Sequence, residues 1–287
     1  MEYKISDRVQ TLKPSAIREI FKYAADPTVV SLSAGNPAPE AFPVKEVAEI
    51  SARIMAERPV DVLQYGLTEG YLPLRQHLTA YMKEKHQVGR DFDDILITSG
   101  AQQVMDLTTK SLCNEGDVVI CEAPSFIGSL NTFRSYNARL RGVPMESDGM
   151  DMNELERALK EEPRAKFIYT IPNFQNPGGV TMVPARRKRL LELSEEYGFM
   201  VVEDDPYGRL RYGGGHVLPL KALSDDVVYL GTVSKVFAPG LRTGWIVAPK
   251  SVLAKINLVK QGTDLCGSAF NQVVVEHYFT DTPWQKT

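Results

Sequence analysis

The chain has 287 residues, of which 43% are hydrophobic and 24% charged, and its formal net charge is −3. This composition is typical of a globular protein and excludes a disordered one, and without a basic block nothing attracts nucleic acid electrostatically. No apolar stretch reaches membrane-spanning length, and the first ten residues lack the apolar segment of a signal peptide. The three cysteines, Cys113, Cys121 and Cys266, have no metal-ligand spacing. We therefore expect a soluble, cytoplasmic protein without a nucleic-acid or membrane partner and without a metal.

In chain order, the sequence predicts a short helix near residues 14–24, a short strand from residue 29, a Gly- and Pro-rich loop to residue 43, and helices over 44–57 and 72–87. From residue 94 onward, apolar runs of strand length alternate with amphipathic helical patterns. The expected strands are 94–100, 117–124, 138–145, 165–172, 199–205, 226–234 and 242–249, and the expected helices are 101–113, 125–136, 152–161, 184–198, 251–261 and 271–279.

This alternation implies βα crossovers and therefore an α/β fold, in three α/β/α layers around a mostly parallel central sheet. Parallel strands are buried on both faces, which explains unbroken apolar runs such as residues 118–121. Ligands bind outside the carboxyl ends of the strands in such sheets. The loops that follow the strands are therefore where a functional site is expected.

Two of these loops offer uncharged groups. Gly100 stands between a strand and a helix, so the helix N-terminus presents free N–H groups that suit an anion, although an ordinary tight turn has the same residues. The loop after strand 165–172 holds Asn173, Gln175 and Asn176 among Pro and Gly residues, which is typical of a turn. Its amides could also be fixed to bind an oxygen atom.

A third loop carries three adjacent acids, Glu203, Asp204 and Asp205, at the end of a buried strand. Adjacent acids normally lie in a solvated turn. At this position one of them has to face the sheet edge, where a buried carboxylate needs a cationic partner or a strong donor.

The fourth loop, TVSKVFAPGLRTGW, places Lys235 after two hydroxyl residues, Thr232 and Ser234, and before Arg242. A lysine near a strand end is usually an exposed residue, but a desolvated lysine becomes a nucleophile that forms a Schiff base. A guanidinium suits a phosphate group. The four loops together supply what pyridoxal 5′-phosphate requires: a Schiff-base lysine, an acid for the pyridine nitrogen and a phosphate site.

The chain resembles the fold-type I, class I/II aminotransferases that use pyridoxal phosphate. It is most similar to the subgroup of 2-aminoadipate, kynurenine and aromatic aminotransferases and the aminotransferase-like domain of MocR regulators. The resemblance covers about residues 28–280 and rests on the motifs LQYG, SGAQQ, PNFQNPGG, EDDPYGRLRY and SKVFAPGLRTGW in this order. It implies the large domain of the fold-type I transferases.

The resemblance also implies roles for single residues. Lys235 would form the cofactor aldimine and transfer a proton, and Asp204 would keep the pyridine nitrogen protonated. Asn176 and Tyr207 would bind the 3′ oxygen of the ring. The remaining implied residues are Phe126 stacked on the ring; Gly100, Ala101, Gln102, Thr232, Ser234 and Arg242 in a phosphate cup; Tyr65 reaching the partner subunit's phosphate in a homodimer with shared sites; and Gly35, Asn36 and Asn176 beside the substrate.

The implied activity is transfer of an amino group from an L-amino acid to a 2-oxo acid, with 2-oxoglutarate as the expected acceptor, in a ping-pong cycle. The expected domains are an N-terminal arm over 1–43, a large cofactor domain over 44–280, and the start of a shortened small domain over 281–287. In the family an arginine of the small domain binds the substrate carboxylate, and no residue here matches it. A pyridoxal phosphate-dependent lyase, a sensor or an inactive fragment therefore stay open as alternatives, and the amino donor is not determined.

Overall fold

The computed structural model describes residues 3–10, 26, 28–30 and 35–284. The helix expected near residues 14–24 lies outside these residues, as do residues 31–34 of the first expected strand. Val29 and Val30, which begin that expected strand, are not in a strand. No helix of the described part of the chain is long and apolar enough to cross a membrane.

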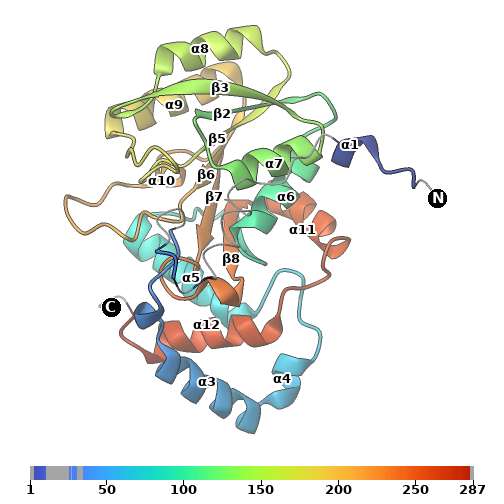
Figure 1. The fold of residues 1–287 in the computed structure, drawn as a ribbon, viewed down its shortest axis with the longest axis vertical. Coiled ribbons are helices and arrows are strands. Elements are labelled where there is room, and N and C mark those ends of the chain that lie inside the picture. The colour runs from blue at the N-terminus through green and yellow to red at the C-terminus, as the bar shows by residue number, and fades with distance from the viewer. Residues whose placement is uncertain (1–2, 11–25, 27, 31–34, 285–287) are drawn as a thin grey trace.

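The centre of the protein is an eight-stranded sheet with the order β1-β8-β7-β6-β5-β2-β3-β4 (Figure 1). Five strands, β2, β3, β5, β6 and β7, run parallel to one another. Strand β8 is antiparallel to both β1 and β7, and β4 is antiparallel to β3. The mostly parallel sheet is thereby confirmed. The strands are β1 (Asp93–Thr98), β2 (Val118–Ala123), β3 (Arg139–Glu146), β4 (Gly149–Met150), β5 (Ala165–Thr170), β6 (Met200–Asp204), β7 (Val227–Thr232) and β8 (Gly244–Pro249).

Most helices begin and end close to where the periodicity predicts. Three further short helices in the described residues, α1, α4 and α10, were not predicted, because four or five residues are too few to carry a helical period. The helices are α1 (Asp7–Gln10), α3 (Val44–Glu57), α4 (Pro59–Leu63), α5 (Leu72–His86), α6 (Ala101–Leu112), α7 (Ile127–Ser135), α8 (Met152–Glu161), α9 (Pro184–Tyr197), α10 (Leu220–Leu223), α11 (Lys250–Gln261) and α12 (Ala269–Asp281), with 3₁₀ turns η1 (Pro39–Ala41) and η2 (Pro239–Leu241).

Successive side chains of each strand enter different hydrophobic cores on the two faces of the sheet. In β1, Ile95 and Ile97 belong to the core under α5 and α12, whereas Leu96 belongs to the core under α6, α7 and α11. In β7, Tyr229 and Leu230 are divided in the same way. Figure 1 shows α6, α7 and α11 on one side of the sheet and α5 on the other, so the three expected layers are present.

The pairing of the strands brings the site loops together. Thr98 at the end of β1 and Thr232 at the end of β7 both pair with Gly244 at the start of β8. The turn after β1, the lysine loop after β7 and Arg242 before β8 therefore meet at one edge of the sheet. The carboxyl ends of β6, β5 and β2 lie at the same edge, because these strands are parallel to β7.

Candidate active site

Asp204 is the last residue of β6, and its carboxylate is buried with only 4% of the residue exposed. Oδ2 accepts a hydrogen bond from the Tyr169 hydroxyl at 2.7 Å, and Tyr169 in turn accepts one from Ser129. Oδ1 is buried and has no hydrogen-bond partner among the described residues. Burial raises the pKa of Asp204 to about 7. A buried oxygen without a partner, on a strand end, is positioned to receive a cation or an N–H donor of a ligand.

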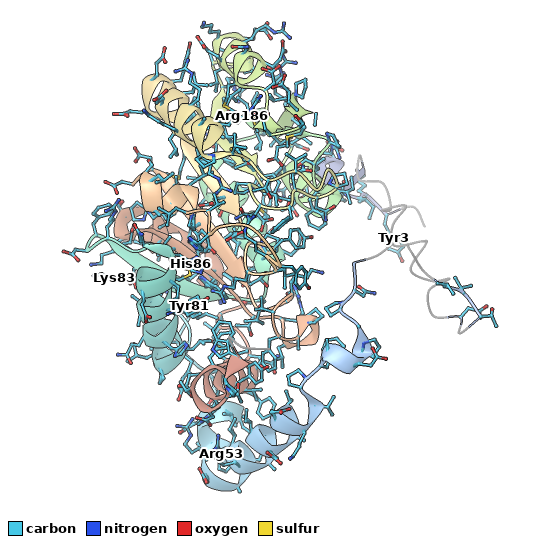
Figure 2. All side chains as sticks on the ribbon, turned by 90° about the vertical axis from the view of Figure 1, so that its left-hand side faces the viewer. Tyr3, Arg53, Tyr81, Lys83, His86 and Arg186 are labelled. Carbon is cyan, nitrogen blue, oxygen red and sulfur yellow. The ribbon has the colours of Figure 1, made fainter. Side chains whose placement is uncertain are left out.

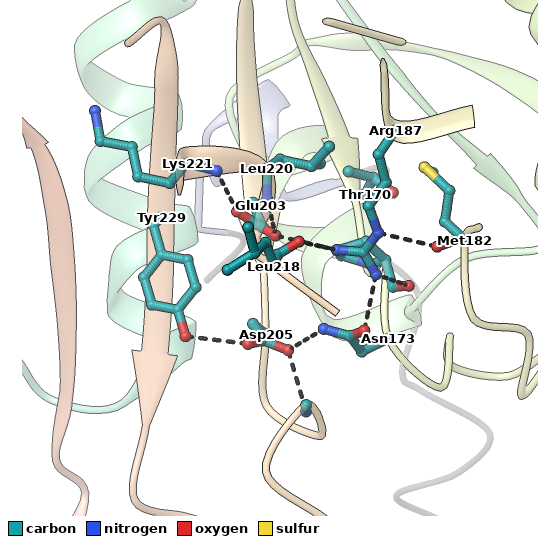
Figure 3. Close-up of polar contacts among 12 residues, drawn as sticks. Thr170, Asn173, Met182, Arg187, Glu203, Asp205, Leu218, Leu220, Lys221 and Tyr229 are labelled. Carbon is teal, nitrogen blue, oxygen red and sulfur yellow. Dashed lines mark hydrogen bonds and ion pairs between the residues drawn. The ribbon is translucent and has the colours of Figure 1, made fainter. Parts of the chain in front are cut away.

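The two neighbouring acids of this strand end are also buried, so all three carboxylates lie inside the protein and not only the one that the sequence indicates. Glu203 accepts hydrogen bonds from the backbone N–H groups of Leu220 and Lys221, at 2.8 and 2.9 Å, at the start of α10 (Figure 3). Asp205 accepts them from the Asn173 amide and from Tyr229. These two carboxylates hold loops in place, which leaves Asp204 as the acid available to a ligand.

Lys235 lies in the loop after β7, and its Nζ donates to the backbone carbonyl of Gly35 at 3.2 Å. Desolvation by burial lowers the pKa of Lys235. Other lysines of the protein, such as Lys221 and Lys260, form ion pairs with aspartates. In the described part of the chain, no carboxylate lies within 4 Å of Lys235 Nζ. A half-buried amine without a carboxylate partner is easier to deprotonate and so to use as a nucleophile.

Asn176 and Tyr207 lie together, as expected for a pair that shares one oxygen of a ligand. The Asn176 amide donates to the Tyr207 hydroxyl at 3.2 Å. Phe126 precedes the first residue of α7 and packs, partly buried, against the core that contains Tyr169. Asn176, Phe126 and Asp204 come from the loops after β5 and β2 and from the end of β6, which are consecutive in the sheet.

Gly100 and Arg242 are in direct contact. Gly100 adopts φ 77°, and a Cβ atom placed on it would lie 2.3 Å from Arg242 Nη2, so only glycine leaves room for this guanidinium. Gly100 precedes α6, whose first N–H groups receive no side-chain cap. Free N–H groups, the positive end of a helix and a guanidinium form a site for a phosphate group. Ala101 is the first residue of this helix.

Thr232 and Ser234 contribute hydroxyls beside this turn, with 2.9 Å between their Oγ atoms. The Gln102 side chain faces away from it, because its amide donates to Gly128 and Thr132 of α7. Only the Gln102 backbone N–H remains for the expected phosphate cup. The Tyr65 side chain is exposed, at 79%, and Asn36 is exposed as well. Gly35, next to Asn36, accepts the hydrogen bond from Lys235, whereas no hydrogen bond among the described residues joins the side chain of Tyr65 or Asn36 to another expected site residue.

Sequence reasoning missed three buried residues that support the site. Tyr169 binds Asp204, and Glu122 accepts hydrogen bonds from Thr170 and Gln175 beside the Asn176 loop. Arg187 of α9, 1% exposed, donates to the Pro172 carbonyl and to Asn173 Oδ1 (Figure 3). An arginine in a polar helix and a tyrosine in a strand have no local signal of such roles, since their partners lie far away in the sequence.

Comparison with known proteins identifies the family. Residues 27–282 match the sequence profile of the class I and II aminotransferases, and the chain belongs to this family. It is 43% identical over 283 residues to aromatic-amino-acid aminotransferase 1 of Thermococcus litoralis and 43% identical over 270 residues to the 2-aminoadipate transaminase of Thermus thermophilus. These alignments cover 96% and 92% of this chain but 68% and 66% of the relatives, so the chain spans about two thirds of their length.

A solved structure agrees with this assignment. The kynurenine aminotransferase of Pyrococcus horikoshii, solved in complex with PMP, superposes with a TM-score of 0.93 at 40% identity. The superposition covers 98% of this chain and 71% of that one. The expected fold-type I transferase architecture is confirmed.

Asp204 yields a prediction for the pH dependence of stability. Its pKa is about 7 in the folded protein, against 3.8 for an ordinary aspartate as in the unfolded chain. The folded state therefore holds the proton more firmly, and wild-type stability falls as pH rises from about 4 to about 7. Asp204→Asn removes this loss. Relative to wild type, the ligand-free variant should gain on the order of 3 kcal/mol in the free energy of unfolding between pH 5 and pH 8. Urea unfolding at the two pH values measures it, and an unchanged difference would contradict the buried, raised acid.

Proposed function

We propose that this chain carries the cofactor site of a pyridoxal phosphate-dependent aminotransferase, which moves the amino group of an L-amino acid to a 2-oxo acid, 2-oxoglutarate, in a ping-pong cycle. The observation that carries the proposal is Asp204 Oδ1, a buried carboxylate oxygen without a partner at the same sheet edge as Lys235 and Arg242. Pyridoxal phosphate fits these residues and, when bound, supplies an electron sink for the charge that develops at the substrate α-carbon.

Each of the chain's own residues has a defined task in this proposal. Asp204 holds the proton on the pyridine nitrogen, since a carboxylate with a pKa near 7 readily ionises beside a cation. Asn176 and Tyr207, which a hydrogen bond joins, would both bind the phenolic oxygen. Lys235 Nζ would hold the cofactor through its amine and, when free, would accept the proton of the substrate α-carbon. Its lowered pKa favours the neutral amine that both tasks need.

The phosphate group is held by the other half of the site. The N-terminus of α6 and the Arg242 guanidinium meet across Gly100, and the hydroxyls of Thr232 and Ser234 lie beside them. A charge-assisted fork and a helix N-terminus bind a phosphate dianion more strongly than neutral donors do. The cofactor is thereby anchored at its phosphate while the ring end stays free to react.

The subunit arrangement and the substrates are part of the proposal. We infer a homodimer in which the exposed Tyr65 reaches the phosphate of the partner subunit. Gly35 and Asn36 would line the substrate side, and domain boundaries at 43/44 and 280/281 follow the expected arm, cofactor domain and small domain. The relatives named above act, by their names, on aromatic amino acids, 2-aminoadipate and kynurenine. Donors with long or aromatic side chains are therefore the first candidates.

The test is a visible absorption spectrum of the purified protein with pyridoxal phosphate, followed by addition of single amino acids. We expect a long-wavelength band that disappears in Lys235→Ala and persists in Lys188→Ala, a substitution of an exposed lysine in α9. A donor amino acid should bleach the band and release its 2-oxo acid, because the amino group stays on the cofactor.

Three other outcomes would decide against this function. A band that responds to no amino acid would indicate cofactor binding without turnover, as in a sensor or an incomplete enzyme. Release of ammonia together with an oxo acid would indicate a lyase. Failure to form any band would remove the cofactor site itself.

Gly100 provides a second prediction with a matched control. Gly100→Ala places a Cβ atom 2.3 Å from Arg242 Nη2 and displaces the guanidinium, so affinity for pyridoxal phosphate should fall by about tenfold or more. Gly89→Ala introduces a side chain at φ 109° with nothing within 4 Å, so it tests backbone strain without the clash. Fluorescence titration measures both variants. Equal affinities in the two variants would contradict the proposed phosphate site.

A further inference from the structure

A hollow lies beside the end of β6, lined in part by Asp205, and no step of the proposed function uses it. Its volume is about 290 Å³. We name it the arginine hollow after two of its lining residues. The side chains that matter for its chemistry are His86, Asn173, Asp205, Arg209, Arg211 and His216.

The arginine hollow is separate from the cofactor site. Asp204 and Asp205 are successive residues, and their tyrosine partners belong to different cores: Tyr169 to the core under α6 and α7, Tyr229 to the core under α5 and α12. Side chains at successive positions of an extended strand point to opposite faces. A ligand in the hollow would therefore lie behind the acid that serves the cofactor.

Both carboxylate oxygens of the acid in the hollow, Asp205, accept hydrogen bonds from neutral donors. Asp205 Oδ1 accepts from Asn173 Nδ2 at 2.9 Å and from the backbone N–H of Gly208 at 3.1 Å, and Oδ2 accepts from the Tyr229 hydroxyl at 3.1 Å (Figure 3). No ion pair joins it to an arginine of the hollow within the described residues. Asp205 thus binds neutral donors, and no carboxylate of the described residues forms an ion pair with the guanidinium group of Arg209 or Arg211.

The guanidinium group of Arg209 is positioned by aromatic rings and not by a carboxylate. Its guanidinium carbon lies 4.4 Å from the centre of the Tyr81 ring and 5.2 Å from that of Trp245. One of its nitrogens, Nη1, is buried without a hydrogen-bond partner in the described part of the chain. Cation–π contacts fix the position of a guanidinium but use none of its N–H donors.

Arg211 approaches from the loop that follows Arg209. It lies over the Phe174 ring at 4.8 Å and donates one hydrogen bond, 3.3 Å long, to Asn173 Oδ1. That oxygen also accepts from Arg187, so two positive groups share one neutral acceptor. Arg209 is held more tightly, since its Nη2 also donates to Met82 Sδ at 3.8 Å, and Arg211 is therefore the arginine whose N–H donors the hollow's own residues satisfy least.

Two histidines, His86 and His216, also line the arginine hollow. His216 Nε2 and His86 Nδ1 are 3.3 Å apart, and His86 Nε2 is buried without a partner in the described residues. Burial, together with the charge of Arg209, lowers the pKa of His86 to about 4, so this ring is neutral at physiological pH. Figure 2 shows His86 and Tyr81 on α5.

We propose that the arginine hollow binds a small oxyanion, a phosphate or carboxylate group, between the guanidinium groups of Arg209 and Arg211 and beside His86. Planar guanidinium forks bind both kinds of oxyanion with paired N–H donors. A volume of about 290 Å³ is roughly that of ten water molecules, so a phosphate or a short dicarboxylate fits. This inference does not depend on the proposed aminotransferase activity.

The test uses the histidine ring signals in NMR spectra, because they report on the hollow and not on the phosphate cup. The chain has four histidines, and a His216→Gln variant assigns one of the two in the hollow. Addition of inorganic phosphate at constant ionic strength should shift the signals of His86 and His216 along a saturable curve. The signal of His277, which lies in α12 and does not line the hollow, should stay in place, whereas His77 is no control because it is close enough to feel the charge of Arg209. Succinate in place of phosphate distinguishes a dicarboxylate from a phosphate ligand by the lower dissociation constant.

Arginine variants locate the anion. Arg211→Gln should weaken phosphate binding by about tenfold or more, because a charge-assisted donor is lost. Arg134→Gln, an exposed arginine in α7, is the matched control and should bind like wild type. Arg209→Lys keeps the charge and loses the fork, which gives a second variant should the first fold poorly. Equal movement of all four histidine signals, no shift with either anion, or unchanged binding in both Arg209→Lys and Arg211→Gln would overturn the proposal.

Discussion

The site depends on a carboxylate that the fold buries without a positive charge beside it. Asp204 ends β6 inside the protein, and among the described residues the Tyr169 hydroxyl alone donates a hydrogen bond to its carboxylate. A buried carboxyl without a cationic partner costs free energy if it ionises, and its pKa near 7 reflects that cost. In the proposed function, a protonated pyridine nitrogen would offset this cost. The burial that suits Asp204 to such a partner is therefore also a local weakness of the ligand-free fold.

The surrounding structure keeps this acid in place by satisfying its neighbours. Glu203 is bound by the first N–H groups of α10, and Asp205 by Asn173 and Tyr229. Burial and the charge of Asp205 raise the pKa of Glu203 to about 7 as well. Because the acids on either side hold loops, the strand end cannot rotate to expose Asp204, and the carboxylate stays directed at the sheet edge.

Periodicity in the sequence predicts the layers, since helices such as α3 and α5 bury a regular stripe and parallel strands are continuously apolar. The loops that carry Lys235, Asp204 and Gly100 follow from the same pattern, because strand ends of a parallel sheet share one edge. The antiparallel direction of β8 was not evident, since an apolar strand has the same composition in either direction. Its pairing nevertheless brings Arg242 to Gly100.

Contacts between distant segments could not be predicted from the sequence. Tyr169 lies 35 positions from Asp204, and Arg187 reaches Asn173 across the end of β5. The side chain of Gln102 is a further example: its motif suggests a phosphate ligand, but hydrogen bonds to α7 hold the amide elsewhere. Tyr65 is exposed in the single chain, so its expected role depends on a second subunit.

Infrared difference spectroscopy of Asp204 tests the central claim most directly. Spectra of wild type minus Asp204→Asn, recorded at pH 6 with and without pyridoxal phosphate, isolate the carboxyl group at position 204. Because its pKa is about 7 without a cation, we predict a protonated C=O band that the cofactor replaces with carboxylate bands. A carboxyl that stays protonated when the cofactor binds, or that is already ionised before binding, would contradict the account.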